Sequence, residues 1–177
     1  MAHDEKVDIV DSEDRVIGED TKERCHLSGK RHRCAAIYVM NEGKLFLQIR
    51  ADHKKVEPGK MDHSAAGHVK KGENYEDAAV RELEEELGIK TNLTFLGKAA
   101  ENKTHTDGRD IKHIFQMYIA EHDGAIKLNK DELKGIALIE PEEIEKMIKE
   151  KPSQFAQGFL ETFPTFIEWY REFGNLP

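Results

Sequence analysis

The chain has 177 residues, which is enough for one domain with its own hydrophobic core. Charged residues make up 35% of it and apolar residues 38%, the balance of a soluble globular protein. The formal net charge of −8 argues against a nucleic-acid backbone as the main partner. The charge does not argue against phosphorylated small molecules as partners, because bound cations can neutralise acidic groups locally.

No segment approaches the roughly 18 consecutive apolar residues of a membrane span, and the N-terminal MAHDEKVDIV lacks the apolar region of a signal peptide. We therefore expect no membrane partner and a cytoplasmic location. The two cysteines, Cys25 and Cys34, have neither the spacing of a zinc site nor that of a disulfide framework. We expect both to be reduced structural thiols.

The first part of the chain predicts a hairpin over residues 7–19 and a short helix over 21–27 that ends near Gly29. Strands are expected over 32–40 and 44–50, on either side of the turn sequence Asn41-Glu42-Gly43. A polar loop over 51–62 then leads into the short segment 63–67.

A helix is expected after Asn74, whose side chain can cap its N-terminus. Gly88 suits the left-handed position after the last turn, where Ile89 can fold back onto Leu83. Apolar residues recur four apart along this helix and predict one buried stripe: Ala79, Leu83 and Leu87.

Three carboxylates of this helix are not explained by folding. Glu82 lies three residues before Glu85 and four before Glu86, so all three share one helical surface. Each of the two like-charge pairs costs an isolated helix about 0.2–0.5 kcal/mol, whereas Mg²⁺ would favour them. Two such ions would polarise a phosphoryl group and supply a bound hydroxide. The alternative is a solvated face on which Arg81 pairs with Asp77, Glu84 or Glu85.

Strands are expected next over 91–100, 109–121 and 132–139, and a helix over 141–149 begins at a proline. The C-terminal segment gathers aromatic residues at mostly three- and four-residue spacing, which predicts a helical stripe bent or broken at Pro164. Packing on the sheet, a homodimer interface and substrate stacking are the three roles considered for these aromatics: Phe155, Phe159, Phe163, Phe166, Trp169, Tyr170 and Phe173.

The stretch GHVKKGENYEDAAVRELEEELGI, residues 67–89, matches every fixed position of the Nudix box, so the chain resembles the Nudix hydrolases. That resemblance implies an α/β fold, an α/β/α sandwich around a mixed β-sheet, and hydrolysis of diphosphates linked to an organic moiety with divalent cations. It implies a backbone carbonyl near Ala66 as a metal ligand and Arg81 as the residue that orients the neighbouring glutamate. We expect Glu73 mainly to brace the loop against the helix, with direct contact to the metal as the alternative.

Features outside the box resemble the isopentenyl-diphosphate isomerase-like branch of the Nudix proteins. True isomerases have a catalytic cysteine where this chain has Ala66, and a catalytic glutamate on the strand that here contains residues 111–113. Alkene isomerisation needs a proton donor and an acceptor, and Ala66 is neither. Three histidines resemble the isomerase metal-binding histidines, although each alone is more often a packed or solvated residue: His26, His32 and His68.

The expected catalytic residues are Arg81, Glu82, Glu85 and Glu86, with the metal, Mg²⁺ or Mn²⁺, held by the three glutamates and Ala66. Glu82 is the first choice of general base, and the later candidates are Glu101, Asp107 and Asp110. Substrate contacts are expected from five residues in or before the box: Arg50, Lys54, Lys55, Gly67 and His68. For the three basic residues among them, Arg50, Lys54 and Lys55, ordinary surface charge is the alternative interpretation.

We expect one domain over residues 1–177: an N-terminal hairpin and helix in 1–31, a core in 32–140 and C-terminal helices in 141–177. The predicted function is metal-dependent hydrolysis of a diphosphate linkage in a nucleoside diphosphate derivative or a related organic pyrophosphate. Two alternatives remain: an isopentenyl-diphosphate isomerase-like enzyme, and a nucleotide-binding regulatory domain with little turnover.

Overall fold

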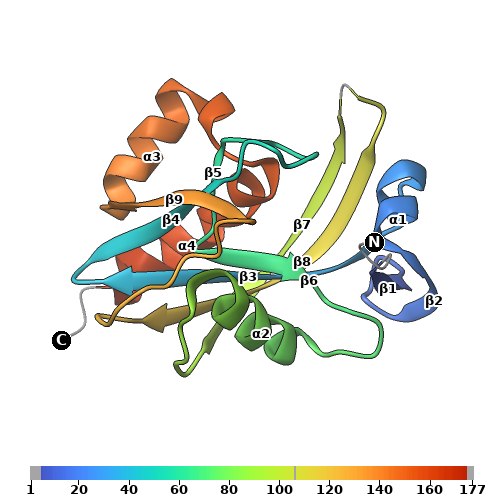
Figure 1. Cartoon of the computed structure of the whole chain (residues 1–177), viewed down its shortest axis with the longest axis horizontal. Coiled ribbons are helices and arrows are strands. Elements are labelled where there is room, and N and C mark those ends of the chain that lie inside the picture. The colour runs from blue at the N-terminus through green and yellow to red at the C-terminus, as the bar shows by residue number, and fades with distance from the viewer. Residues whose placement is uncertain (1–4, 106, 175–177) are drawn as a thin grey trace.

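The computed structural model describes residues 5–105 and 107–174. One mixed β-sheet lies between helices: α2 covers one face, and α4 with the shorter α3 covers the other (Figure 1). The expected α/β/α sandwich around a mixed sheet is confirmed.

The elements follow the predicted order, with ends moved by a few residues. The helices are α1 (Lys22–Ser28), α2 (Tyr75–Leu87), α3 (Pro141–Glu150) and α4 (Gln157–Phe173), with a 3-10 turn η1 (Pro152–Gln154) before α4. The strands are β1 (Lys6–Val10), β2 (Val16–Thr21), β3 (His32–Asn41), β4 (Lys44–Arg50), β5 (Met61–Asp62), β6 (Ala65–His68), β7 (Thr94–Thr104), β8 (Asp110–Glu121) and β9 (Leu133–Ile139).

Strand β3 organises the sheet. It pairs with β8 in parallel and with β1, β4 and β6 in antiparallel orientation, while β4 continues to β5 and β9. Residues 34–40 of β3 are all buried, because the strand has packed layers on both faces. The short strand β6 runs beside β3 and leads directly into the loop before α2.

The two faces of β3 belong to two hydrophobic clusters. Ala35, Ile37 and Val39 face the cluster that contains Leu83 and Leu87 of α2. Alternate residues of the same strand, among them Ala36 and Tyr38, face the cluster of α4. This period-2 alternation places α2 on one side of the sheet and the aromatic C-terminal helix on the other.

Helix α2 begins and ends as its sequence predicts. The Asn74 side chain accepts a hydrogen bond from the backbone N–H of Asp77 at 2.9 Å. Gly88 is left-handed with φ 67°, and the N–H of Ile89 donates to the Leu83 carbonyl at 3.4 Å.

The structure adds detail at two segments. Residues 63–67, expected as a short segment before the box, include part of strand β6, whose backbone pairs with β3. Helix α4 was expected to be bent or broken at Pro164, and it is not broken but runs through the proline as one element. Interior proline costs a helix about 3 kcal/mol, and the buried rings on both sides of it, such as Phe163 and Phe166, supply enough packing to hold the helix together.

The C-terminal aromatic residues pack on the sheet, as one of the three alternatives predicted. Phe159 and Phe166 are fully buried, and the Phe166 ring stacks on Tyr38 of β3 with centroids 4.4 Å apart. Phe173, at the end of α4, is 42% exposed. No helix within the described part of the chain has the length and apolar character needed to cross a membrane.

We predict that Phe159→Ala lowers the free energy of unfolding by about 3–5 kcal/mol, because it leaves a large cavity between α4 and the sheet. Phe173→Ala is the matched control on the same helix and should change it by less than about 1 kcal/mol. Urea unfolding followed by circular dichroism measures both, and equal losses in the two variants would contradict the packing described here.

Candidate active site

Arg81 of α2 is bonded to the loop that precedes its helix. Its Nε donates to Glu73 Oε1 at 2.9 Å and its terminal nitrogen to Glu73 Oε2 at 2.9 Å, a bidentate pair. Burial alone would raise the pKa of Glu73, but the hydrogen bonds from Arg81 and the Lys70 backbone N–H, together with the charges of these two residues, lower it. Glu73 therefore braces the loop against α2 in the structure.

The same guanidinium reaches the strand and two carboxylates. It donates to the backbone carbonyl of His68 at 3.0 Å, and its other terminal nitrogen contacts Glu82 and Glu85. Arg81 thus joins β6, the loop and α2 at one point. This arrangement suits the orienting role predicted for it.

Glu82 lies directly against Gly67 of β6. A Cβ atom at position 67 would stand 2.1 Å from the Glu82 carboxyl carbon, so any side chain there would displace the carboxylate. Burial raises the pKa of Glu82 to about 7, and the neighbouring Arg81 only partly opposes this. A glutamate in this state exchanges a proton near neutral pH.

Glu86 is more deeply enclosed and is 6% exposed. One of its oxygens accepts hydrogen bonds from the Ala66 backbone N–H at 3.1 Å and from Gln48 Nε2 at 3.3 Å. Burial, followed by the charge of Glu82, raises the pKa of Glu86 well above its usual value. The contact with Ala66 uses the N–H group, and the predicted ligand role of the Ala66 carbonyl stays a prediction.

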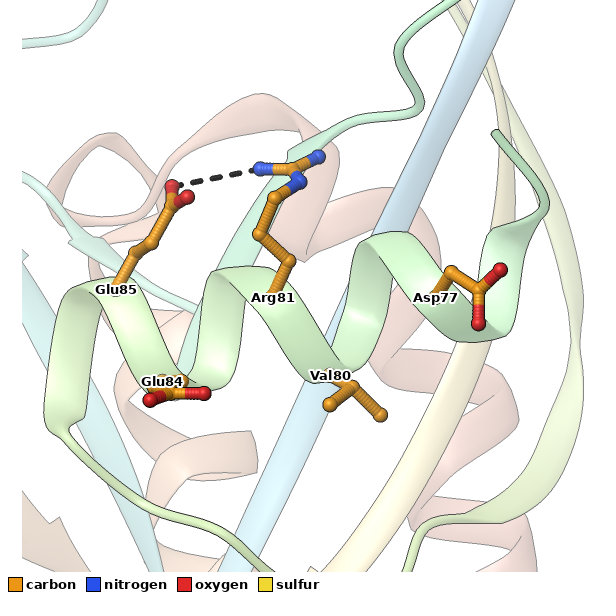
Figure 2. A pocket seen from close by; sticks show the side chains of 5 residues that line it. All are labelled: Asp77, Val80, Arg81, Glu84 and Glu85. Carbon is orange, nitrogen blue, oxygen red and sulfur yellow. Dashed lines mark hydrogen bonds and ion pairs between the residues drawn. The ribbon is translucent and has the colours of Figure 1, made fainter. Parts of the chain in front are cut away.

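Glu85 behaves differently, because its side chain is 53% exposed. Figure 2 shows a shallow pocket on the outer side of α2, where Glu85 and Arg81 point toward each other and lie 3.4 Å apart at their nearest nitrogen and oxygen atoms. Glu84 and Val80 point to another side of the helix. Glu82 and Glu86 do not line this pocket.

The donor set on α2 fits a hard divalent cation. It consists of carboxylate oxygens on one helical surface, and burial raises the pKa values of two of these carboxyl groups, Glu82 and Glu86. The three side chains do not form a compact ligand cluster: Arg81 holds Glu85 toward the solvent, and Glu86 is turned toward β4 and β6. A cation would have to draw them together.

The predicted phosphate-binding cations already have partners. Arg50 donates to Asp62 at 3.0 Å and to the Val56 carbonyl, and Lys54 pairs with Glu132. Lys55 is largely exposed and pairs with Glu23. Their contact with a phosphate therefore stays a prediction.

The later candidates for the general base lie away from α2. Glu101 is buried on β7 and bonded to His113, and Asp107 pairs with Arg109 in the loop between β7 and β8. Asp110 begins β8, where it pairs with Lys112 at 3.1 Å. None of these three contacts the carboxylates of α2, so Glu82 is the best-placed candidate.

The structure brings a second group together that sequence reasoning found only in part. His26, His32 and His68 meet as their resemblance to the isomerase histidines suggested, and His113 of β8 joins them. In the parallel pairing of β3 with β8, His113 stands opposite His32. That register could not be read from a single sequence, which showed residues 111–113 only as lacking a carboxylate.

Comparison with known proteins identifies the family. The NUDIX domain matches residues 30–159 of the chain. A Nudix hydrolase of Clostridium acetobutylicum is 36% identical over 168 residues, which cover 89% of this chain and 81% of that protein. An isopentenyl-diphosphate Delta-isomerase of Pectobacterium atrosepticum is 27% identical over 95% of this chain and 94% of its own length.

Solved structures show the same fold. A protein of Deinococcus radiodurans superposes with a TM-score of 0.72 at 24% identity, covering 88% of this chain and 94% of that one. The NUDIX domain of Shewanella oneidensis NrtR, solved with ADP-ribose, gives 0.58 at 14% identity over 77% of this chain and 86% of that one. The chain therefore belongs to the Nudix family and is a Nudix hydrolase, an enzyme that acts on phosphoric anhydrides.

Proposed function

We propose that this chain hydrolyses a diphosphate linkage in a nucleoside diphosphate derivative or a related organic pyrophosphate, and that it requires Mg²⁺ or Mn²⁺ to do so. One observation carries the proposal: Glu82, with a pKa near 7, is held between Gly67 and Arg81 beside the buried Glu86. A simple solvated helix face would leave these side chains exposed and their pKa values low.

Glu82, Glu85 and Glu86 are the residues that would hold the metal, with the Ala66 carbonyl as a further ligand. When bound, such an ion polarises the phosphoryl oxygen and lowers the pKa of water. The residues of this chain supply the surrounding geometry. Arg81 orients Glu82, and Glu73 fixes Arg81 from the other side.

Glu82 is the proposed general base. In the metal-free protein burial raises the pKa of Glu82 to about 7, and its carboxyl group lies beside Glu86, another of the proposed metal ligands. Its carboxylate takes the proton of the attacking water while Arg81 keeps it directed toward β6. A low-pKa carboxylate such as Asp107, whose pKa its hydrogen bonds with Arg109 lower to about 2, is a weaker base.

The substrate class is chosen from chemistry and from relatives of the same fold. One such structure holds ADP-ribose, and another, from C. elegans, is an Ap4A hydrolase. ADP-ribose and Ap4A both contain a phosphoric anhydride between organic groups. The acidic charge of this chain is compatible with these compounds, since the cation that accompanies the substrate offsets it.

The isomerase alternative has little support at the residues it needs. Ala66 has only a methyl group where isomerases have a catalytic thiol, and His113 occupies the strand where they have a carboxylate. Glu101, which stands opposite His113 on the neighbouring strand β7, is itself engaged with His113. A proton donor and acceptor on opposite sides of an alkene are therefore missing.

The proposal is tested with a panel of ADP-ribose, dinucleoside polyphosphates, nucleoside triphosphates and prenyl diphosphates, each with Mg²⁺ or Mn²⁺. We expect phosphate-containing products from at least one nucleoside compound and none when the metal is omitted. Interconversion of prenyl diphosphates would support the isomerase instead. Binding of a nucleotide without products would support a regulatory domain, and reaction in ¹⁸O-labelled water would identify the attacked phosphorus.

We predict that Glu85→Gln and Glu86→Gln each lower turnover about 10²–10³-fold at fixed Mg²⁺, the range for loss of one electrostatic contact to the transition state. Neither change should destabilise the metal-free protein, because each relieves repulsion between like charges. Glu84→Gln is the matched control: Glu84 lies on the same helix, is exposed and, within the part of the chain that the structure describes, forms its one ion pair with Lys90, so turnover should be unchanged. Full turnover in both test variants would refute the assignment.

Glu82 also predicts how stability depends on pH. Its pKa rises from 4.5 in the unfolded chain to about 7 in the folded one, so the folded state binds more protons between these values. Its contribution therefore destabilises the metal-free protein increasingly as the pH rises from about 4.5 to 7. We expect the difference in unfolding free energy between wild type and Glu82→Gln to shift against the wild type from pH 5 to pH 8.

Taking the difference between wild type and Glu82→Gln cancels the contributions of the other titrating groups to the unfolding free energy. The buried histidines are such groups: their lowered pKa values make the folded protein more stable as the pH rises toward about 6.5, which is opposite to the effect of Glu82. Saturating Mg²⁺ should abolish the shift. A difference that is independent of pH would show that the Glu82 carboxyl titrates normally.

A further inference from the structure

A chain of hydrogen-bonded polar side chains crosses the apolar interface between α4 and the sheet and ends at an arginine at the end of β4. In order, its members are Tyr38 of β3, Thr162 of α4, His63, Asp62 of β5 and Arg50 of β4. The first four are buried, and the most accessible of them, Asp62, is 6% exposed. Burying polar groups among apolar side chains costs free energy unless each group finds a partner.

The His63 ring is held at both of its nitrogens. Nδ1 lies 2.8 Å from Asp62 Oδ1, and Nε2 lies 2.6 Å from Thr162 Oγ1. The Tyr38 hydroxyl donates to the same Thr162 oxygen at 2.7 Å. The rings of Tyr38 and Phe159 both stand edge-on to the imidazole, each with its centroid 5.4 Å away. Because any rotation of the ring would break a buried hydrogen bond, His63 is fixed in one orientation.

Asp62 connects this fixed ring to Arg50. Its Oδ1 accepts from the backbone N–H of His63 at 2.9 Å as well as from the ring, and its Oδ2 accepts from Arg50 Nη1 at 3.0 Å. Burial alone would raise the pKa of Asp62, but the hydrogen bonds from His63 and the electrostatic attraction of His63 and Arg50 lower it to about 2. Both carboxylate oxygens therefore have partners, and the carboxylate cannot turn without losing one.

The Arg50 guanidinium keeps part of its capacity as a donor. Its Nε and Nη2 donate to the Val56 carbonyl at 3.3 and 3.0 Å, and its Nη1 donates to Asp62. A guanidinium has five N–H groups, so one on Nη1 and one on Nη2 have no acceptor within residues 5–105 and 107–174. The Arg50 side chain is 23% exposed. Two N–H groups on a fixed planar cation at the surface suit a phosphoryl oxygen.

A short path of contacts joins Arg50 to the acidic site. Asp62 stands opposite Gln48 in the pairing of β5 with β4, and Gln48 donates to Glu86 at 3.3 Å. The charge of Asp62 is also one of the causes, after burial and the charge of Glu82, that raise the pKa of Glu86. Arg50 is thus bonded to a residue whose strand partner binds a proposed metal ligand.

Helix α4 fixes the segment between β4 and β6 at two places. At the N-terminus of α4, both oxygens of Glu57 accept from the Gln157 backbone N–H at 3.0 Å. Glu57 has φ 49°, a left-handed value that surrounding contacts must maintain in a residue other than glycine. Val56, whose carbonyl binds the guanidinium, directly precedes it. At the second place, Thr162 binds His63.

We propose that Asp62 and His63 are positioning residues for the reaction, and that they hold the Arg50 guanidinium so that its two remaining N–H groups bind a phosphoryl oxygen of the substrate. Thr162 completes the chain by fixing the imidazole to α4. The inference rests on the proposed function, which supplies the diphosphate. A role in folding alone would be served by apolar side chains, since well-packed apolar replacements of buried ionic groups are often neutral or stabilising.

The test measures binding of inorganic pyrophosphate with Mg²⁺ to the full chain by titration calorimetry. Arg50→Gln and Asp62→Asn should each weaken binding about 10–100-fold, the effect of losing a hydrogen bond to a charged group. In the double variant, Asp62→Asn should add little to Arg50→Gln, because it acts through the same guanidinium. Asp52→Asn is the matched control: Asp52 lies in the same loop, is exposed and pairs with Lys134, so binding should be unchanged.

A second pair of variants tests the buried end of the chain. Thr162→Val removes the hydroxyl at nearly equal volume and should weaken pyrophosphate binding about 2–10-fold, the net effect of one neutral hydrogen bond, whereas Thr162→Ser should restore it. If Asp62→Asn does not fold, this pair and Arg50→Gln decide the question. With any compound that the wild type hydrolyses, the variants should raise KM and leave kcat nearly unchanged, as expected for lost uniform binding.

The outcomes separate this inference from the proposed function. Pyrophosphate binding that depends on Asp62 and Arg50, without turnover of any compound, would refute the hydrolase and leave the positioning role intact. Full binding in Asp62→Asn and Thr162→Val, or additive losses in the double variant, would overturn the positioning role while the hydrolase stands. A wild type that does not bind pyrophosphate would overturn it as well.

Discussion

The Arg81 guanidinium is the interaction on which the acidic site depends. It binds the loop through Glu73, the strand through the His68 carbonyl, and its own helix through Glu82. Without Arg81, the carboxylates of Glu73 and Glu82 would carry unpaired charge in a site that water reaches poorly, and this would cost the folded state considerable free energy. With it, Glu82 keeps a fixed position but not a low pKa, because one guanidinium divided between several acceptors only partly offsets the burial.

Strand β6 shows how four residues can serve two sites. Its alternating faces give Gly67 to α2 and His68 to the histidine cluster, while the Ala66 N–H binds Glu86. Gly67 is required here for close approach rather than for backbone freedom, since the Glu82 carboxyl fills the space of a Cβ atom. The acidic helix and the imidazole cluster are thus separated by one strand, with β6 common to both.

Local signals in the sequence predicted local structure well. Asn74 and Gly88 mark the two ends of α2 as predicted, because N-terminal capping and a left-handed C-terminal residue depend only on a few neighbouring residues. The contacts that complete the sites are not local: Gln48 reaches Glu86 from β4, and His113 reaches His32 through strand register. The partners of Arg50 and Lys54 were missed for the same reason, since a charged residue in a loop shows nothing of which acid lies opposite.

The parallel pairing of β3 with β8 has a consequence for how the protein is made. The central strand emerges from the ribosome long before its partner, since His32 and His113 are 81 positions apart. Strand pairs that are distant in sequence form late, because the chain must lose the entropy of closing a long loop before the contacts between the strands stabilise it. Until β8 arrives, one edge of an apolar strand stays open to other nascent chains, so chaperones should matter more for this fold than for one built from hairpins.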